Sequence, residues 1–289
     1  MDKERFYQQV ETQMVAFANE QPDMRAVMIV GATERIAHPA DEWSDLDIEI
    51  FTDDVEQYMD DTLWIRQFGA IWICLTVVDR DPQRLMVLFE GGHKVDFAFS
   101  PVTALQAHID AQTLSVTQRG GYRVLLDKDN LTKKLPAIAD VIDKYTPPDR
   151  EEFHENVQTF WYSTVYVARQ IRRRNLWVVK YRDRALKEAL LEMLVWHANT
   201  RRVQIQTWHD GHFMAEWLDA DTYTEVQTLF AAFDAKASWK ALLTSMQLFR
   251  RTARETAQAL DYLYPVTMDD NITGLITRLY TEDPEISAD

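Results

Sequence analysis

The segment from Asp45 to Phe51 carries an acidic residue at every second position. Asp45, Asp47 and Glu49 alternate with apolar residues, so on a β-strand all three carboxylates lie on one face. Two carboxylates about 6–7 Å apart along a strand suit the oxygen coordination of Mg²⁺. The alternative is a half-exposed strand with a solvated acidic face, which is the commoner meaning of an isolated Asp-x-Asp pair.

Two further segments favour the metal interpretation. In the segment from Lys94 to Phe99 the apolar residues share one face of the expected strand and Asp96 points to the other, so a third carboxylate can join the site. Upstream, an apolar strand ends at Gly31. A glycine at this point lets backbone N–H groups approach a phosphate if a helix follows.

The elements that would position these residues change in type along the chain. The first half alternates a helix over residues 3–20 with strands over 25–30, 46–51, 72–78 and 94–99, which predicts an α/β layer around a sheet. Pro147 and Pro148 mark a boundary, because adjacent prolines remove two backbone donors and force extended geometry. Beyond them, apolar residues recur at helical spacing over 186–197 and 239–260. We expect two domains, residues 1–146 and a helical bundle over 150–289.

Composition limits the classes of partner. The 289 residues include 46 Asp and Glu against 31 Lys and Arg, a net charge of −15, and 46% are hydrophobic. This balance predicts a folded, soluble chain that repels nucleic acids and anionic membranes and attracts cationic ligands. The N-terminus lacks the apolar stretch of a signal peptide, and no window resembles a membrane span. We therefore expect a cytoplasmic protein.

The order of strand, glycine turn, Asp-x-Asp and later Asp is similar to that of nucleotidyltransferases with a polymerase-β-like palm. The segment from Gly31 to Glu49 resembles the active-site segment of the aminoglycoside 6-adenylyltransferases (streptomycin adenylyltransferases), where a Gly-Ser-Arg turn leads through a Pro-containing loop to an aromatic residue and Asp-x-Asp. Further segments resemble the family in the same order over nearly the whole chain: 64–69, 94–96, 124–129, 160–161, 190–196, 247–250, 264–265 and 271–273.

The resemblance implies an enzyme with an α/β nucleotidyltransferase palm built on a mixed sheet, followed by an all-α domain. It implies transfer of AMP from ATP to a hydroxyl of an aminoglycoside such as streptomycin, with release of pyrophosphate and a requirement for Mg²⁺. Asp45 and Asp47 would hold two ions that bridge the triphosphate. Asp96 would ligate the second ion or accept the proton of the attacking hydroxyl, and its position makes it the best candidate base. ATP and Mg²⁺ would lie between the domains, opposite the cationic acceptor.

Further candidate contacts for the nucleotide and the acceptor lie in both halves of the chain. Lys180 resembles a family lysine that faces the nucleotide cleft. Glu49 and Asp183 are candidate contacts for a cationic acceptor, because guanidinium and ammonium groups pair with carboxylates. Trp161 is a further candidate, because an indole N–H seeks a polar partner at the edge of a core. The alternatives are surface charge for the two acids and a core position for the tryptophan.

The glycine turn departs from the family pattern. Ala32 and Thr33 stand where relatives carry Ser and Arg, so Thr33 would have to supply the hydroxyl and Arg35 the cation near the phosphates. This departure supports a first alternative, a nucleotidyltransferase that acts on another hydroxylated small molecule. A second alternative is a catalytically silent relative that binds a nucleotide or a partner protein. The presence of three facing carboxylates argues against silence.

Overall fold

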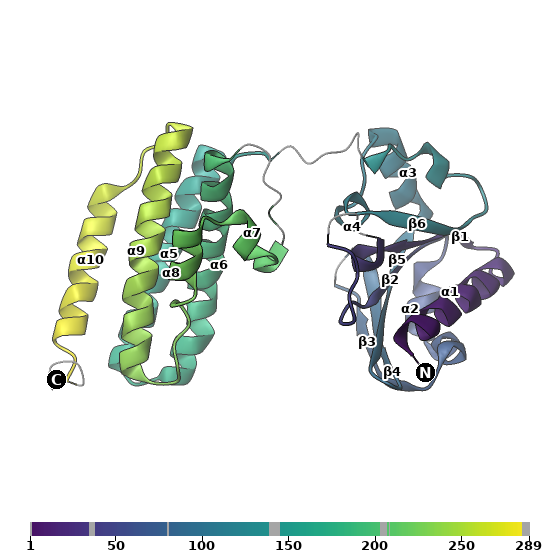
Figure 1. Ribbon diagram of the computed structural model, residues 1–289, viewed down its shortest axis with the longest axis horizontal. Coiled ribbons are helices and arrows are strands. Elements are labelled where there is room, and N and C mark those ends of the chain that lie inside the picture. The colour runs from purple at the N-terminus through teal and green to yellow at the C-terminus, as the bar shows by residue number, and fades with distance from the viewer. Residues whose placement is uncertain are drawn as a thin grey trace. The chain divides into compact units, whose positions relative to one another are not determined.

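The computed structural model describes residues 2–34, 38–79, 81–138, 145–202, 207 and 209–284, with Ala32 and Thr33 described by their backbone alone. The chain divides into two compact units, Met1–Asp143 and Lys144–Asp289, which are drawn in Figure 1 and described in turn. Among the helices of the described residues, none combines the length and the apolar character needed to cross a membrane.

The first unit is built on one six-stranded mixed sheet with the order β3-β4-β5-β2-β1-β6. Strands β2 and β5 pair in parallel, and the other neighbours pair antiparallel. Its elements are α1 (Lys3–Glu20), β1 (Met24–Val30), η1 (Gly31–Glu34), β2 (Leu46–Thr52), α2 (Val55–Asp60), η2 (Leu63–Phe68), β3 (Ile71–Val77), β4 (Gln83–Phe89), β5 (His93–Pro101), α3 (Val102–Ala111), α4 (Val116–Arg119), β6 (Tyr122–Asp127) and η3 (Thr132–Lys134). The mixed sheet expected from the sequence is confirmed.

Each face of this sheet has its own apolar core. Phe6, Val10 and Met14 of α1 are buried at helical spacing and belong to a cluster that includes the apolar residues of β2 at positions 46, 48 and 50. On the other face, Leu105 and Ile109 of α3 pack with apolar residues of β1. Because side chains alternate along a strand, the acidic residues of β2 lie on the face covered by α3.

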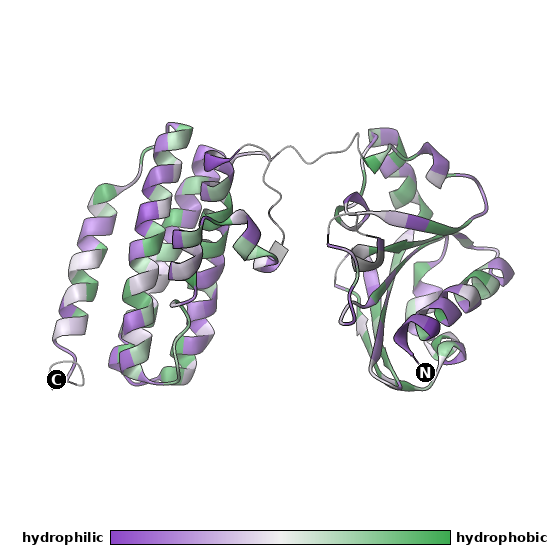
Figure 2. Ribbon diagram, in the orientation of Figure 1, coloured by the Kyte–Doolittle hydropathy of each residue, from purple (hydrophilic) through white to green (hydrophobic). Residues whose placement is uncertain are grey.

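The second unit is helical, as expected. Its elements are α5 (Arg150–Arg172), α6 (Leu176–Arg201), η5 (His209–Gly211), α7 (Met214–Trp217), α8 (Ala220–Val226), α9 (Ala235–Leu260) and α10 (Val266–Thr281). The long helices share one apolar core, and Figure 2 shows hydrophobic and hydrophilic residues distributed around them as in amphipathic helices. Asp149 begins α5 with a capping box, and Asp234 caps α9.

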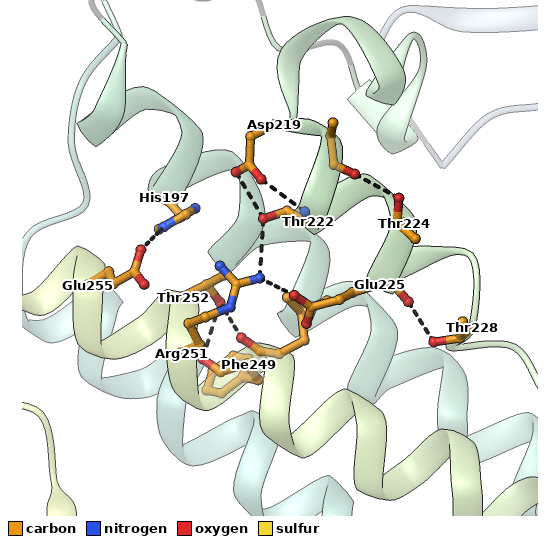
Figure 3. Close-up of polar contacts among 12 residues, drawn as sticks. His197, Asp219, Thr222, Thr224, Glu225, Thr228, Phe249, Arg251, Thr252 and Glu255 are labelled. Atoms are coloured by element: carbon orange, nitrogen blue, oxygen red, sulfur yellow. Dashed lines mark hydrogen bonds and ion pairs between the residues drawn. The ribbon is translucent and has the colours of Figure 1, made fainter.

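Polar side chains connect three helices of this unit (Figure 3). His197 Nε2 of α6 lies 2.7 Å from Glu255 Oε2 of α9. Arg251, also on α9, donates hydrogen bonds to Thr222 Oγ1 and Glu225 Oε1 of α8 at 3.2 and 2.8 Å. Burial lowers the pKa of His197, so the imidazole is neutral at physiological pH and its contact with Glu255 is a hydrogen bond. The network fixes α8 against the bundle.

Candidate active site

Three carboxylates from two strands of the first unit converge. Asp45 directly precedes β2, Asp47 is the second residue of β2, and Asp96 lies on β5. One oxygen atom of each carboxylate lies within 4.8 Å of the corresponding oxygens of the other two. The three residues proposed from the sequence as metal ligands are therefore neighbours in space.

The parallel pairing of β2 with β5 produces this convergence. Asp47 is opposite Asp96 in the register of the two strands, and Ile48 is opposite Phe97. Neighbouring strands lie about 4.8 Å apart, and residues in register point to the same face of the sheet. Two acidic residues 49 positions apart in the sequence are thus side by side.

A tight turn places the first carboxylate. Asp41 Oδ1 accepts hydrogen bonds from the backbone N–H of Trp43 and from Ser44 Oγ, both at 2.9 Å. The turn directly precedes Asp45, and Trp43 within it is 84% exposed. This is the loop in which the sequence resemblance expects an aromatic residue before Asp-x-Asp.

Burial makes ionisation of these carboxyl groups unfavourable. Asp96 is only 6% exposed, so its part of the acidic face is buried rather than solvated. Burial, followed by the charges of Asp45 and Asp96, raises the pKa of Asp47 to about 7. Burial also raises the pKa of Asp96, although the ammonium of Lys94 opposes the shift. Full ionisation of the three carboxylates is therefore costly, and a nearby cation would favour it.

Lys94 supplies one such cation within the protein. Its Nζ donates hydrogen bonds to Asp45 Oδ2 and, at 3.1 Å, to Asp96 Oδ2. Burial lowers the pKa of Lys94, but the hydrogen bond to Asp45 and the charge of Asp96 outweigh this effect, and the net shift is upward. Lys94 was not predicted as a site residue, although it has the same parity on β5 as Asp96.

The cluster has the donor set of a divalent-cation site. Carboxylate oxygens are the ligands that Mg²⁺ prefers, and three of them lie close together here. Among the described residues, Asp96 Oδ1 is buried and has no hydrogen-bond partner. Since a buried charged oxygen without a partner is costly, this atom has a free coordination position that a cation or a proton donor could fill.

Gly31 lies directly against the cluster. It begins η1 immediately after β1 with a φ of +77°, a conformation that favours glycine. A Cβ atom at this position would overlap Asp47 Oδ2. The glycine is therefore required for the close approach of the backbone to a candidate metal ligand, which is a role additional to the phosphate contact expected from the sequence.

The remaining predicted nucleotide contacts are Thr33, Arg35 and Lys180. Arg35 lies outside the described residues, and so does the side chain of Thr33. Lys180 belongs to α6 of the helical unit, where its Nζ donates hydrogen bonds to Ala231 O and Ser238 Oγ, each at 3.0 Å. Burial lowers its pKa. The assignment of Lys180 to the triphosphate stays a prediction.

Glu49 has a structural role that the sequence did not suggest. Its carboxylate is buried and accepts hydrogen bonds from Thr117 Oγ1 and, at 2.8 Å, from Gln118 Nε2. Gln118 also closes the capping box of α4 with Ser115. Both carboxylate oxygens are thus committed to holding α4 on the sheet, which is at odds with the prediction that Glu49 binds an acceptor.

Trp161 is likewise at odds with the predicted acceptor contact. It is fully buried in the core of the helical unit, and its Nε1 donates a hydrogen bond to Tyr264 Oη at 3.2 Å. An indole without exposed surface has none to offer a ligand. Asp183, by contrast, is half-buried on α6 and accepts a hydrogen bond from Lys187 Nζ at 2.9 Å. Its proposed contact with an acceptor stays a prediction.

Comparisons with known proteins find similar sequences and a similar solved structure. The sequence model of the family described as streptomycin adenylyltransferase matches residues 4–279. An aminoglycoside 6-adenylyltransferase of Bacillus subtilis is 26% identical over 283 residues, covering 91% of this chain and 94% of the relative. One from Campylobacter jejuni is 24% identical over 272 residues, covering 91% of each. The crystal structure of a Bacillus subtilis aminoglycoside 6-adenyltransferase matches 94% of this chain and 97% of that chain, with 21% identity and a TM-score of 0.44.

The mixed sheet and its carboxylate cluster, together with the match over nearly the whole chain, define a nucleotidyltransferase. The chain belongs to the streptomycin adenylyltransferase family. The family and the enzyme class expected from the sequence are both confirmed.

The raised pKa of Asp47 predicts an unusual pH dependence of stability. Its pKa is about 7 in the folded protein against 3.8 for an unperturbed carboxyl group. Between these values the folded protein holds a proton that the unfolded chain has lost, so the free energy of unfolding falls as the pH rises. Asp47→Asn removes this dependence. With EDTA at pH 8, we expect the variant to be more stable than the wild type by on the order of 2 kcal/mol.

Urea unfolding at pH 5 and pH 8 measures this effect, with Glu42→Gln as the control because Glu42 is an exposed acid in the loop before the cluster. The control should follow the wild type at both pH values. A wild-type protein that is as stable as Asp47→Asn at pH 8 would contradict the proposed repulsion.

The position of Gly31 predicts a loss of metal binding in Gly31→Ala. The new methyl group strains the backbone at positive φ and pushes the Asp47 carboxylate away. We expect Mn²⁺, measured by electron paramagnetic resonance, to bind at least about tenfold more weakly, or about 1.4 kcal/mol. Gly274→Ala is the matched control, because a Cβ atom at Gly274 of α10 meets no atom within 4 Å. Unchanged Mn²⁺ affinity in Gly31→Ala would show that the turn does not place Asp47.

Proposed function

We propose that the protein is an O-adenylyltransferase that moves AMP from ATP to a hydroxyl group of an aminoglycoside such as streptomycin, with Mg²⁺ as cofactor and pyrophosphate as the second product. The observation that carries this proposal is the convergence of Asp45, Asp47 and Asp96 in a chain of the streptomycin adenylyltransferase family. The names of the relatives from Bacillus subtilis and Campylobacter jejuni support the aminoglycoside as acceptor.

Asp45 and Asp47 would hold two Mg²⁺ ions. When bound, the metal neutralises charge on the triphosphate and makes its α-phosphorus more electrophilic. Asp47 is the more constrained ligand, since it is held between the Gly31 turn and the neighbouring strand β5. This rigidity suits a reaction that depends on positioning and charge neutralisation.

Asp96 would act as the general base, and its Oδ1 atom would receive the proton. As this proton leaves the acceptor hydroxyl, the hydroxyl oxygen bonds to the α-phosphorus of ATP. The bond from that phosphorus to the oxygen bridging toward the β-phosphate breaks, and pyrophosphate departs with the electron pair. Oδ1 has no hydrogen-bond partner in the described part of the chain, and burial raises the pKa of the carboxyl group toward the range useful for proton transfer.

The charge of the protein supports a cationic acceptor. The net charge of −15 attracts polycations such as aminoglycosides, whose guanidinium and ammonium groups pair with carboxylates. Asp45 remains 31% exposed and Asp183 is only half-buried. We place the acceptor next to exposed acids of this kind rather than at Glu49 or Trp161, which are buried.

An assay with purified protein tests the reaction. The protein is incubated with Mg²⁺, each of the four nucleoside triphosphates and a panel of aminoglycosides, and the products are analysed by mass spectrometry. We expect streptomycin to gain one AMP unit from ATP. Transfer to a neutral alcohol alone would favour a different small-molecule acceptor, and no transfer to any acceptor would contradict catalysis.

Substitutions in the cluster distinguish a metal ligand from the general base. Asp45→Asn should abolish both Mn²⁺ binding and turnover, because it removes a ligand. Asp96→Asn should lower the turnover rate by at least about 10²-fold, as expected for loss of a general base, with Mn²⁺ affinity reduced much less. Glu42→Gln should behave as the wild type. If Asp45→Asn and Asp96→Asn lose Mn²⁺ affinity equally, Asp96 contributes to metal binding as much as Asp45 does.

A further inference from the structure

The carboxylate cluster already contains a cation of the protein itself. Lys94 Nζ donates hydrogen bonds to one oxygen of Asp45 and one of Asp96, and these two acids belong to the same set whose oxygens lie within 4.8 Å of one another. Lys94 is thus a cationic side chain that hydrogen-bonds directly to this cluster. Arg84 of β4 also acts on Asp47 and Asp96, but through its charge alone.

The backbone that carries Lys94 is held by hydrogen bonds, whereas its side chain is partly exposed to solvent. Tyr7 Oη of α1 donates a hydrogen bond to the backbone carbonyl of Lys94 at 3.0 Å, and Lys94 is paired with Leu88 in the register of β4 and β5. The side chain is 41% exposed and has four rotatable bonds between Cα and the ammonium. The ammonium can therefore move toward solvent without any change in the sheet.

The ammonium and a divalent cation compete for these oxygens. An ammonium group pairs with carboxylates at a nitrogen–oxygen distance of about 2.7–2.9 Å, whereas Mg²⁺ requires oxygen ligands at about 2.0–2.1 Å in octahedral geometry. Two cations bound to the same carboxylates also repel each other at short range. Occupation by one therefore weakens the binding of the other.

We propose that Lys94 is the resident counter-ion of the metal site and is exchanged for the metal ion when the site is loaded. In the metal-free protein its ammonium balances Asp45 and Asp96, and metal binding must first break these two ion pairs. Lys94 is thus a positioning residue that stabilises the empty cluster and lowers its affinity for metal. This inference rests on the metal site of the proposed function and assigns Lys94 a role opposed to that of the ligands.

Metal affinity measured without nucleotide or acceptor tests the exchange. We compare the binding of Mn²⁺ alone, by electron paramagnetic resonance, to the wild type, Lys94→Met and Lys94→Arg. Lys94→Met removes the competitor and should bind Mn²⁺ at least about tenfold more tightly, about 1.4 kcal/mol. Lys94→Arg keeps the charge and should stay close to the wild type. Without metal, Lys94→Met should have a lower melting temperature, and saturating Mn²⁺ should raise that temperature more than it does for the wild type.

Lys128→Met is the matched control. Lys128 is half-buried in the same unit, and its Nζ also makes two hydrogen bonds, but to the backbone carbonyls of Ala18 and Gln21. Its loss should lower stability without changing Mn²⁺ affinity. A general loss of stability of the unit would therefore change the Mn²⁺ affinity of both lysine variants. Removal of a competing cation changes the Mn²⁺ affinity of Lys94→Met alone.

The outcomes separate this inference from the proposed function. If the wild type binds Mn²⁺ and a folded Lys94→Met protein binds it equally or more weakly, the exchange is overturned. The proposed metal site then remains intact. Absence of Mn²⁺ binding in both proteins overturns both proposals, because a counter-ion then has nothing to compete with. Binding by Lys94→Met that is tighter than in the wild type, together with loss of binding in the double variant with Asp47→Asn, supports both.

Discussion

The repulsion among three carboxylates on one buried sheet face is the constraint on which the rest of the site depends. Asp45, Asp47 and Asp96 have oxygens within 4.8 Å of one another, and burial with mutual repulsion raises the pKa of Asp47 to about 7. Such a cluster is stable only when a positive charge accompanies it. In this structure that charge is the Lys94 ammonium, and in the proposed reaction it is Mg²⁺.

The fold holds the acids together against this repulsion. Strands β2 and β5 have apolar side chains buried on the opposite face of the sheet, under α1 and η2, so that neither strand can move away without opening a core. Gly31 then allows the backbone after β1 to lie against Asp47. The alternating acids at the start of β2 thus have two roles. Asp45 and Asp47 belong to the cluster, whereas Glu49 holds α4 on the sheet through hydrogen bonds.

Local patterns in the sequence predicted many of the elements and the residues of the cluster. Alternation predicted that Asp45, Asp47 and Asp96 point away from the apolar core, and the period of 3.6 predicted the helical second half. The parallel pairing of β2 with β5 could not be derived in this way, because it depends on segments distant in sequence. Strand β4 was missed although Leu85, Val87 and Phe89 alternate with less buried residues.

The predictions that did not fit share a physical cause. Glu49 and Trp161 were considered as contacts for a ligand because their side chains are suited to cations, but each has its polar atoms satisfied inside the protein. Residue type alone does not distinguish a buried partner from a ligand. Lys94 is the opposite case, because its residue type gave no reason to predict a role in the site. Its hydrogen bonds to Asp45 and Asp96 place it there.

The central claim is that these three carboxylates form the metal site of a nucleotidyltransferase. The most direct measurement is anomalous diffraction at the manganese edge from crystals grown with Mn²⁺ and a non-hydrolysable ATP analogue. Our account predicts an anomalous peak in direct coordination with oxygens of Asp45 and Asp47, next to the triphosphate and with the Lys94 ammonium displaced. A bound nucleotide whose Mn²⁺ lies elsewhere, with Lys94 still paired to Asp45 and Asp96, would contradict it.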